Sequence, residues 1–216
     1  MQTDLVCEDI HSTTDGLAYY VGLGNAYFDQ GNFNTAIIVY TCALEQEPTY
    51  APALVARGFS FAALGNQGNA LDDYNLALDL DEDLIPAYIN RGILYTQQGR
   101  FGLALSDFDL VIALDPENAR AYNNRGLVYA AEGDYDLAIA DFEMAIALDD
   151  SYAAPLASLG VVYSAMAVEQ YAAYRDIIGA SARLPAGDAD LVIQSLALER
   201  ESGTFNTWLA LQTPSR

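Results

Sequence analysis

The stretch ARAYNNRGLVYAAEGDYDLAIADFEMAIALDDSY, residues 119–152, decides the fold of this chain. It places a glycine, Gly126, three residues before an aromatic residue, Tyr129. The same pair recurs every 34 residues, as Gly24/Tyr27, Gly58/Phe61, Gly92/Tyr95 and Gly160/Tyr163. Five copies at a fixed period indicate a chain built by repetition, which stacks into an extended surface rather than a closed catalytic pocket.

Each copy predicts two helices joined by a tight turn. In the fourth copy, one apolar stripe at helical spacing contains Tyr122 and Tyr129. A second stripe contains Ala138 and Phe142, and Gly133 between the two is typical of a turn. The earlier copies carry equivalent glycines, Gly31, Gly65 and Gly99. Small residues let the two helices approach closely, and aromatic side chains fill the space beside them.

The copies follow one another without insertion or deletion. The four regular copies are residues 17–50, 51–84, 85–118 and 119–152. A fifth, degenerate copy covers residues 153–186, where Ala167 replaces the turn glycine and Asp176 stands in the place of an aromatic residue. Terminal repeats are often atypical because one side lacks a neighbour.

These residues resemble the tetratricopeptide repeat (TPR) family, whose 34-residue units carry the same small–aromatic–small–aromatic arrangement and a closing proline, here Pro48 and Pro116. The resemblance covers residues 17–152 well and residues 153–186 partly. It implies an all-α fold, a right-handed superhelical solenoid of antiparallel helix pairs. The resemblance also implies that the first helix of each pair lines a concave groove.

The two ends lie outside the repeats. Residues 1–16 form an N-terminal arm, and residues 187–216 are predicted to form a C-terminal capping helix and a short tail. Asp188 is a suitable N-cap for a helix near residues 189–201. The tail holds four large apolar residues: Phe205, Trp208, Leu209 and Leu211.

The composition is rich in apolar residues and strongly acidic. The formal net charge is -21, all nine basic residues are arginines, and lysine is absent. Such a surface repels phosphate backbones and anionic lipids, so neither nucleic acid nor an anionic membrane is an expected partner.

The sequence predicts no membrane insertion, because it has no run of about 18 apolar residues. Residues 1–9 also lack the basic region that begins a signal peptide. We expect a cytoplasmic protein if the chain is complete, and an exported or cell-surface protein if Met1 is not the native start.

Cys7 and Cys42 permit one disulfide bridge, which would hold the arm against the first copy. The alternative is two unrelated thiols, with Cys42 half-buried on a helix and Cys7 in the arm. The number of cysteines does not decide between these two interpretations.

Charged residues follow the repeat as well. Three arginines precede repeat glycines and three aspartates recur at the same period: Arg57, Arg91, Arg125, Asp73, Asp107 and Asp141. We interpret them as a ladder of ion pairs between first and second helices. The alternative is a row of arginines that binds acidic ligands, but each arginine has an aspartate available within its own copy.

The sequence offers few groups for catalysis or for binding a metal. His11 is the only histidine and lies in the polar arm, so acid–base and nucleophilic centres lack candidate parts. An acidic cluster lies between the second and third copies, at Asp79, Asp81, Glu82 and Asp83. Leu84 and Asn90 stand where a calcium loop needs glycine and glutamate, so we interpret the cluster as a solvated turn. We expect no enzymatic activity, no cofactor and no metal.

The residues beside the packing face of each first helix are predicted to line the groove, and none of them is charged. They are Val21, Asn25, Phe28, Val55, Phe59, Ile89, Ile93, Asn123, Leu127 and Val161, with Ala62, Thr96, Ala130, Ala157 and Ser164 beside them. Some TPR grooves bind a C-terminal carboxylate through lysine, arginine and asparagine. Asn25 fits that pattern, whereas Val21 and Ala56 stand where polar or basic groups are needed.

An uncharged, largely apolar stripe favours a non-enzymatic scaffold that binds an apolar helix or peptide segment of another protein. Alternatively, the superhelix is tight and these side chains bury one another. A second function fits the same features: a structural subunit whose apolar tail, residues 205–211, enters the groove of a neighbouring copy. Such head-to-tail contacts build oligomers or filaments.

Overall fold

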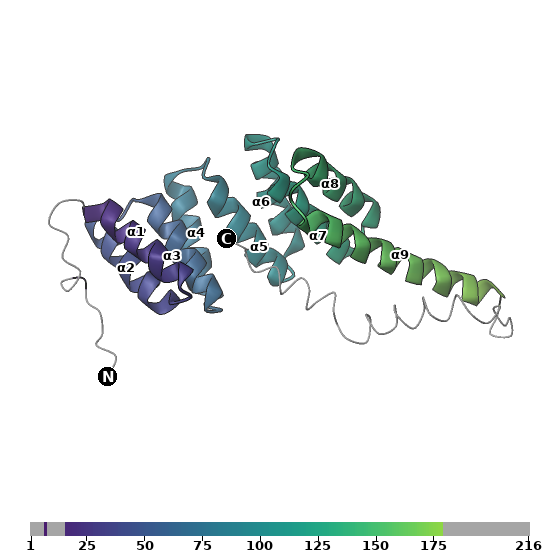
Figure 1. Ribbon diagram of the computed structural model, residues 1–216, viewed down its shortest axis with the longest axis horizontal. Helices are drawn as coiled ribbons and strands as arrows, with labels where there is room; N and C mark the ends of the chain where they lie inside the picture. Colours follow the sequence, from purple (N-terminus) through teal and green to yellow (C-terminus); the bar gives the residue numbers. More distant parts are fainter. Residues whose placement is uncertain (1–6, 8–15, 179–216) are drawn as a thin grey trace. The chain divides into compact units, whose positions relative to one another are not determined.

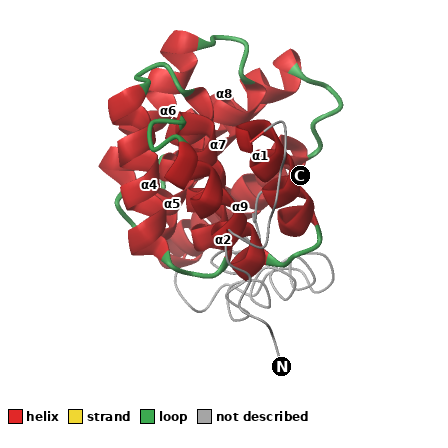
Figure 2. Ribbon diagram, turned by 90° about the vertical axis from the view of Figure 1, so that its left-hand side faces the viewer, coloured by secondary structure: helices red, strands yellow, loops and turns green. Residues whose placement is uncertain are grey.

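The computed structural model describes Cys7 and residues 16–178, and every regular element within residues 16–178 is an α-helix (Figures 1 and 2). The helices are α1 (Gly16–Asp29), α2 (Phe33–Gln46), α3 (Ala51–Ala63), α4 (Gln67–Leu80), α5 (Ile85–Gln97), α6 (Phe101–Leu114), α7 (Ala119–Glu132), α8 (Tyr135–Leu148) and α9 (Ala154–Ile178). The second helices α2, α4, α6 and α8 begin 34 residues apart. The prediction of an all-α chain of repeated helix pairs is confirmed. The rest of the arm, the predicted capping helix and the tail (187–216) lie outside the described residues.

A glycine with left-handed backbone closes each of the four turns between paired helices. The φ angles of Gly31, Gly65, Gly99 and Gly133 are 74°, 77°, 69° and 88°. Glycine adopts positive φ without the steric cost that a Cβ brings. The predicted turns are therefore confirmed. Pro52 and Pro86 lie in the first turns of α3 and α5, where their missing N–H leaves no helical hydrogen bond unmade.

The two helices of a pair meet where a glycine faces an aromatic ring. A Cβ at Gly58 would lie 2.7 Å from Cε1 of Tyr74, and a Cβ at Gly92 would lie 2.8 Å from Cε1 of Phe108. Both rings are completely buried, at 1% and 0% exposure. The same arrangement joins Gly24 to Tyr40 and Gly126 to Phe142. The glycines therefore set the distance between the helices, as the sequence predicts.

The helices group into two compact units. The first contains α1–α6 and ends at Leu114, and the second begins at Asp115 and contains α7–α9. In the first unit α2 packs against both α1 and α3, and α4 packs against both α3 and α5, so successive pairs are joined side by side. In the second unit α9 packs against α8 and α7, around Leu127, Phe142 and Val162.

The fifth copy differs from the other four. Its first helix does not turn at Ala167, and α9 continues from Ala154 to Ile178 without a break. The physical reason is local, because Ala167 replaces the glycine that takes positive φ in the other copies. Within the described residues, this copy is therefore one long helix.

A disulfide bond joins Cys7 to Cys42, with 5.4 Å between the two Cα atoms, and so decides between the two interpretations left open above. Cys42 is 1% exposed, and Cys7 packs against the core cluster around it. The equivalent side chains of the next copies, Leu76, Leu110 and Met144, are 45–46% exposed. The bridged arm residue therefore covers a position that is open in the later copies.

We predict that Gly24→Ala destabilises the protein by about 1–3 kcal/mol, because the added methyl group overlaps the buried ring of Tyr40. Gly22 lies in the same helix, is exposed, and has no atom within 4 Å of its Cβ position. Gly22→Ala is the matched control and is expected to stabilise by about 0.5–1 kcal/mol. Urea unfolding measures both changes, and equal effects in the two variants would contradict this packing.

Reduction of the disulfide is expected to lower the stability by about 3–4 kcal/mol, because the bond closes a loop of 35 residues in the unfolded chain. Unfolding midpoints with and without reductant measure the effect. Cys7→Ser is expected to reproduce the loss and to make the midpoint insensitive to reductant. A midpoint that reductant does not change in the wild-type chain would argue against the bridge.

Candidate functional site

The repeated arginines form paired hydrogen bonds with the repeated aspartates. Arg57 donates from Nε and Nη2 to the two carboxylate oxygens of Asp73, at 2.9 and 2.7 Å. The same two-point contact joins Arg91 to Asp107 and Arg125 to Asp141. The aspartates are buried, so each arginine compensates a charge that has lost water. The predicted ladder of ion pairs between first and second helices is confirmed.

In the first unit the ladder also joins neighbouring copies. Nη1 of Arg57 donates to Oγ1 of Thr41 at 3.2 Å, and Nη1 of Arg91 donates to Oδ1 of Asn75 at 2.7 Å. All three nitrogen atoms of each guanidinium therefore donate within the chain. This engagement disfavours the alternative in which the arginines form a row that binds acidic ligands.

The pKa values of both members of the Arg91–Asp107 ion pair are raised, for different reasons. Burial raises the pKa of Asp107, against the opposing hydrogen bond and charge of Arg91. The same hydrogen bond raises the pKa of Arg91. The guanidinium also lies over the rings of Tyr88 and Tyr95, at 5.5 and 5.9 Å from their centres. Arg91 is thus held on several sides by its own chain.

Two of the predicted groove residues contact each other across neighbouring copies. The rings of Phe28 in α1 and Phe59 in α3 are stacked, with centres 4.7 Å apart. Phe33, at the start of α2, packs against Phe28 at 5.0 Å. All three rings are half-buried. Phe33 is absent from the predicted groove because it belongs to a second helix, although its place directly after the turn brings it to the end of α1.

Asn25 has an internal partner in the structure. The hydroxyl of Tyr40 donates to Oδ1 of Asn25 at 2.6 Å. Burial, together with the charge of Asp29, raises the pKa of Tyr40 to about 12, so this hydroxyl stays protonated near neutral pH. The carbonyl oxygen of Asn25 is thereby held by its own copy, while the residue remains exposed.

The remaining predicted residues of the first unit differ in exposure. Val21, Val55 and Ile93 are half-buried, whereas Ile89 is only 6% exposed. Helices α1 and α3, and likewise α3 and α5, contact each other, so these residues belong to neighbouring helices of one unit. We call Val21, Asn25, Phe28, Val55, Phe59 and Ile93 the uncharged stripe.

In the second unit the predicted groove residues on α7 are buried, whereas those on α9 stay accessible. On α7, Asn123, Leu127 and Ala130 are 0%, 5% and 4% exposed. On α9, Val161 and Ser164 are half-buried and Ala157 is exposed. Leu127 and Ala130 pack into the core cluster with Phe142 and Val162. The α7 side chains therefore follow the alternative in which they are buried within the chain, and they offer a partner little surface.

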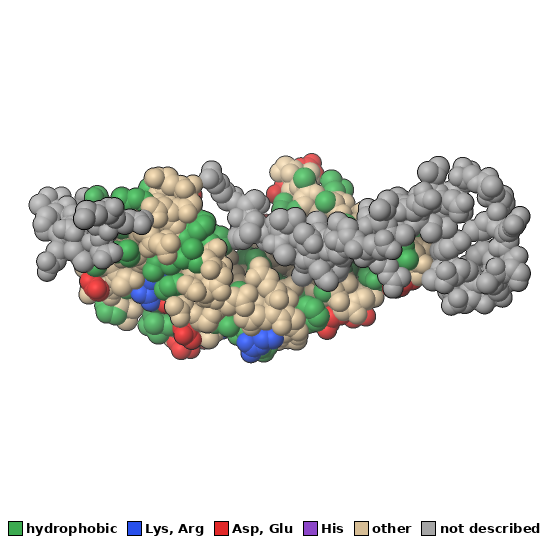
Figure 3. Space-filling view, turned by 90° about the horizontal axis from the view of Figure 1, so that it is seen from below, with side chains coloured by type: hydrophobic (Ala, Val, Ile, Leu, Met, Phe, Trp, Pro, Cys, Tyr) green, Lys and Arg blue, Asp and Glu red, His purple; other side chains and the backbone are tan. Residues whose placement is uncertain are grey.

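Hydrophobic side chains reach the surface in patches on the face drawn in Figure 3, with acidic side chains scattered among them. None of the described helices is long and apolar enough to cross a membrane. In the same residues, no three histidine, cysteine, aspartate or glutamate side chains gather as a metal site would require.

Comparison with protein families gives two matches. A family model described as a tetratricopeptide repeat matches residues 89–153, and one described as a TPR repeat matches residues 24–65. A search of curated proteins gives no match.

Solved structures give several similar chains. The crystal structure of MamA is 26% identical, covers 65% of this chain and 82% of its own, and has a TM-score of 0.58. The first TPR of Spaghetti (RPAP3), solved with the HSP90 peptide SRMEEVD, is 26% identical over 54% of this chain and 93% of its own, at a TM-score of 0.52. PilF of Pseudomonas aeruginosa, at 24% identity, covers 91% and 90% with a TM-score of 0.66 and shows the fold alone. These likenesses confirm the predicted all-α solenoid of repeated helix pairs.

We predict that Arg91→Lys lowers stability by about 1–2 kcal/mol, because an ammonium group cannot reproduce the two-point contact with Asp107. Arg100 is exposed, makes one long hydrogen bond, of 3.4 Å, to Gln98, and lies over the ring of Tyr95, at 4.6 Å from its centre. A lysine can keep its charge over that ring. Arg100→Lys is the matched control and is expected to change stability by less than about 0.5 kcal/mol. Thermal unfolding compares the two, and a loss in the control as large as at Arg91 would refute the role of the ladder.

Proposed function

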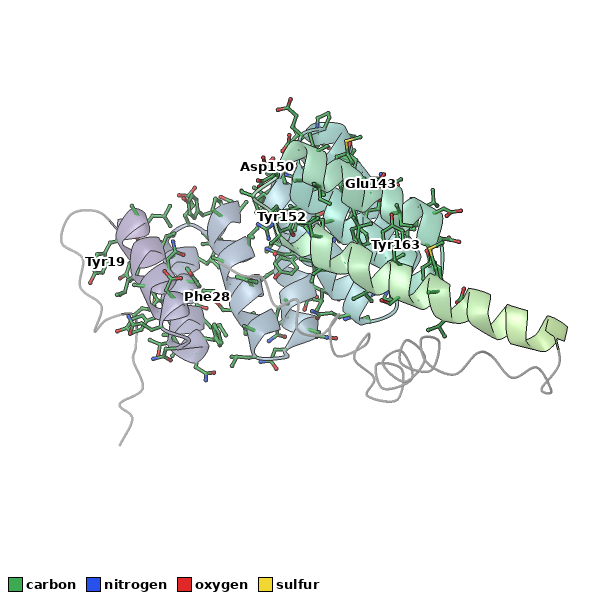
Figure 4. The ribbon with its side chains drawn as sticks, turned by 45° about the vertical axis from the view of Figure 1, so that its right-hand side comes forward. Tyr19, Phe28, Glu143, Asp150, Tyr152 and Tyr163 are labelled. Carbon is green, nitrogen blue, oxygen red and sulfur yellow. A yellow bond between two sulfur atoms is a disulfide. The ribbon has the colours of Figure 1, made fainter. Side chains whose placement is uncertain are left out.

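Because the chain is a tetratricopeptide repeat protein, and such repeats serve as scaffolds for protein–protein interaction, we propose that it binds an apolar helix or peptide segment of a partner on the uncharged stripe of its first unit. The proposal includes no enzymatic step and no cofactor. The observation that carries it is the stacked pair Phe28 and Phe59, two half-buried rings from neighbouring copies. Figure 4 labels Phe28 on α1.

The chemistry of the uncharged stripe indicates which class of partner segment it would bind. Large apolar residues that stay partly accessible gain from burial against another apolar surface, and aromatic anchors contribute most. The stripe contains no charged residue. The arginines at 57 and 91 are engaged with Asp73 and Asp107. A partner segment that brings apolar side chains therefore fits better than one that brings carboxylates.

The segment proposed for this chain differs in charge from the peptide that the RPAP3 domain was solved with. The peptide SRMEEVD, which that domain was solved with, carries three acidic side chains. The net charge of -21 opposes such a ligand, and the stripe supplies no cation to hold it. We propose that this chain recognises a different class of segment.

We predict that an amphipathic helical peptide with an uncharged apolar face binds the wild-type chain and that SRMEEVD does not. Phe59→Asp and Ile93→Asp are each expected to weaken that binding at least tenfold, or by about 1.4 kcal/mol, because a carboxylate then faces the apolar peptide. Fluorescence anisotropy with labelled peptides measures the affinities. Circular dichroism checks that the helices persist.

Leu80→Asp is the matched control, because Leu80 is 42% exposed on the second helix α4 and lies outside the stripe. Its affinity is expected to equal that of the wild type. Unchanged binding in both stripe variants, or an equal loss in the control, would remove the stripe from the proposed function.

Self-assembly through the tail (Phe205, Trp208, Leu209 and Leu211) remains a second proposed function, and these residues lie outside the described part of the chain. If the tail enters the groove of a neighbour, particle size is expected to grow with protein concentration. Deletion of residues 204–216 is expected to abolish that growth. Size-exclusion chromatography with light scattering measures it, and growth that survives the deletion would exclude the tail.

A further inference from the structure

Within the part of the chain that the structure describes, one face of α9 lacks the second-helix cover that the first helices of the regular copies have. In the four regular copies, the repeat glycine lies under an aromatic ring of the second helix, as Gly126 lies under Phe142. Gly160 is the equivalent glycine of α9, yet it is exposed and has no atom within 4 Å of its Cβ position. Because α9 continues straight past Ala167, no second helix within the described residues covers this face.

The uncovered face is a regular stripe of alternating large and small residues. Leu156 is 56% exposed and Tyr163 is 51% exposed, and both Gly160 and Ala167 are exposed as well. Spacings of four, three and four residues place the four positions on one side of a helix. Figure 4 shows Tyr163 on α9, whose C-terminal part extends beyond α7 and α8 in both ribbon views (Figures 1 and 4).

This stripe is complementary to itself when two helices run in opposite directions. If Tyr163 of one helix lies opposite Gly160 of another, the same register places Leu156 opposite Ala167. Each large side chain then meets a small one, at both ends of the contact. A parallel pair would instead oppose Tyr163 to Tyr163 and leave a gap between the two glycines, so the pattern favours the antiparallel arrangement.

The charge distribution permits a second copy at this face. The whole chain carries a net charge of -21, which opposes most contacts between copies. Residues 151–168, however, contain no charged side chain. Glu169 follows directly and accepts a hydrogen bond from the hydroxyl of Tyr135 in α8, at 3.3 Å, so its carboxylate is turned toward its own unit.

We propose that two copies of the chain pair through α9 in an antiparallel, two-fold contact, with Tyr163 of each copy covering Gly160 of the other. The contact is closed, since both copies use the same surface, and it therefore yields a dimer rather than a filament. It is independent of the uncharged stripe of the first unit and of the tail.

Sedimentation velocity of the full chain over a range of concentrations tests the proposal. The expected species has twice the chain mass of 23.3 kDa. Gly160→Leu is expected to raise the dissociation constant of the dimer at least about tenfold, because the leucine fills the space that receives Tyr163. The variant is expected to leave the fold of the isolated chain intact, since the site is open and leucine favours a helix more than glycine does.

Gly22→Leu is the matched control, because Gly22 is likewise an exposed helical glycine in open space, and it is expected to leave the dimer unchanged. A mixture of Leu156→Cys and Ala167→Cys chains tests the register. It is expected to form a disulfide-linked pair that neither variant forms alone.

Three outcomes would overturn the proposal. The first is a monomer at all concentrations, which would leave the face to the chain's own C-terminal segment or to a different protein. The second is a dimer that Gly160→Leu does not weaken. The third is a dimer that is lost only on deletion of residues 204–216, which would assign the association to the tail.

Discussion

The close packing of a second-helix aromatic ring on a first-helix glycine is the contact on which the rest of the structure depends. It recurs four times, from Gly24 with Tyr40 to Gly126 with Phe142, and each ring is almost completely inaccessible to solvent. This contact sets the distance within each helix pair. The remaining faces of the paired helices contact neighbouring copies or solvent. These faces carry the ion pairs and the uncharged stripe.

The buried ion pairs complete the packing and keep their arginines engaged within the chain. Arg57 and Arg91 are engaged by aspartates of their own copy and by polar groups of the preceding copy. These cations join the helices and the neighbouring copies of the first unit. Beside them, Phe28 and Phe59 stay partly accessible in an otherwise acidic protein. That combination is the physical basis for our proposal that the chain binds apolar segments.

Most of the fold could be predicted from the sequence, because the residues that form the helix pairs, the turns and the ion pairs all recur every 34 residues. The other features of the fold depend on contacts that do not recur with this period, so the sequence pattern does not predict them. The burial of Leu127 arises from packing with α9, and the pairing of Cys7 depends on the path of the arm. The unbroken course of α9 follows from a single substitution, Ala167 for glycine, whose consequence only the structure displays.

Photo-crosslinking from position 59 tests the central claim most directly. A benzoylphenylalanine that replaces Phe59 in the full chain is predicted to form a covalent adduct with an apolar helical segment of a bound protein. The same group in place of Leu80, on the second helix α4, is predicted to form none. Equal crosslinking from both positions, or an adduct only at position 80, would contradict the assignment of the uncharged stripe as the binding surface.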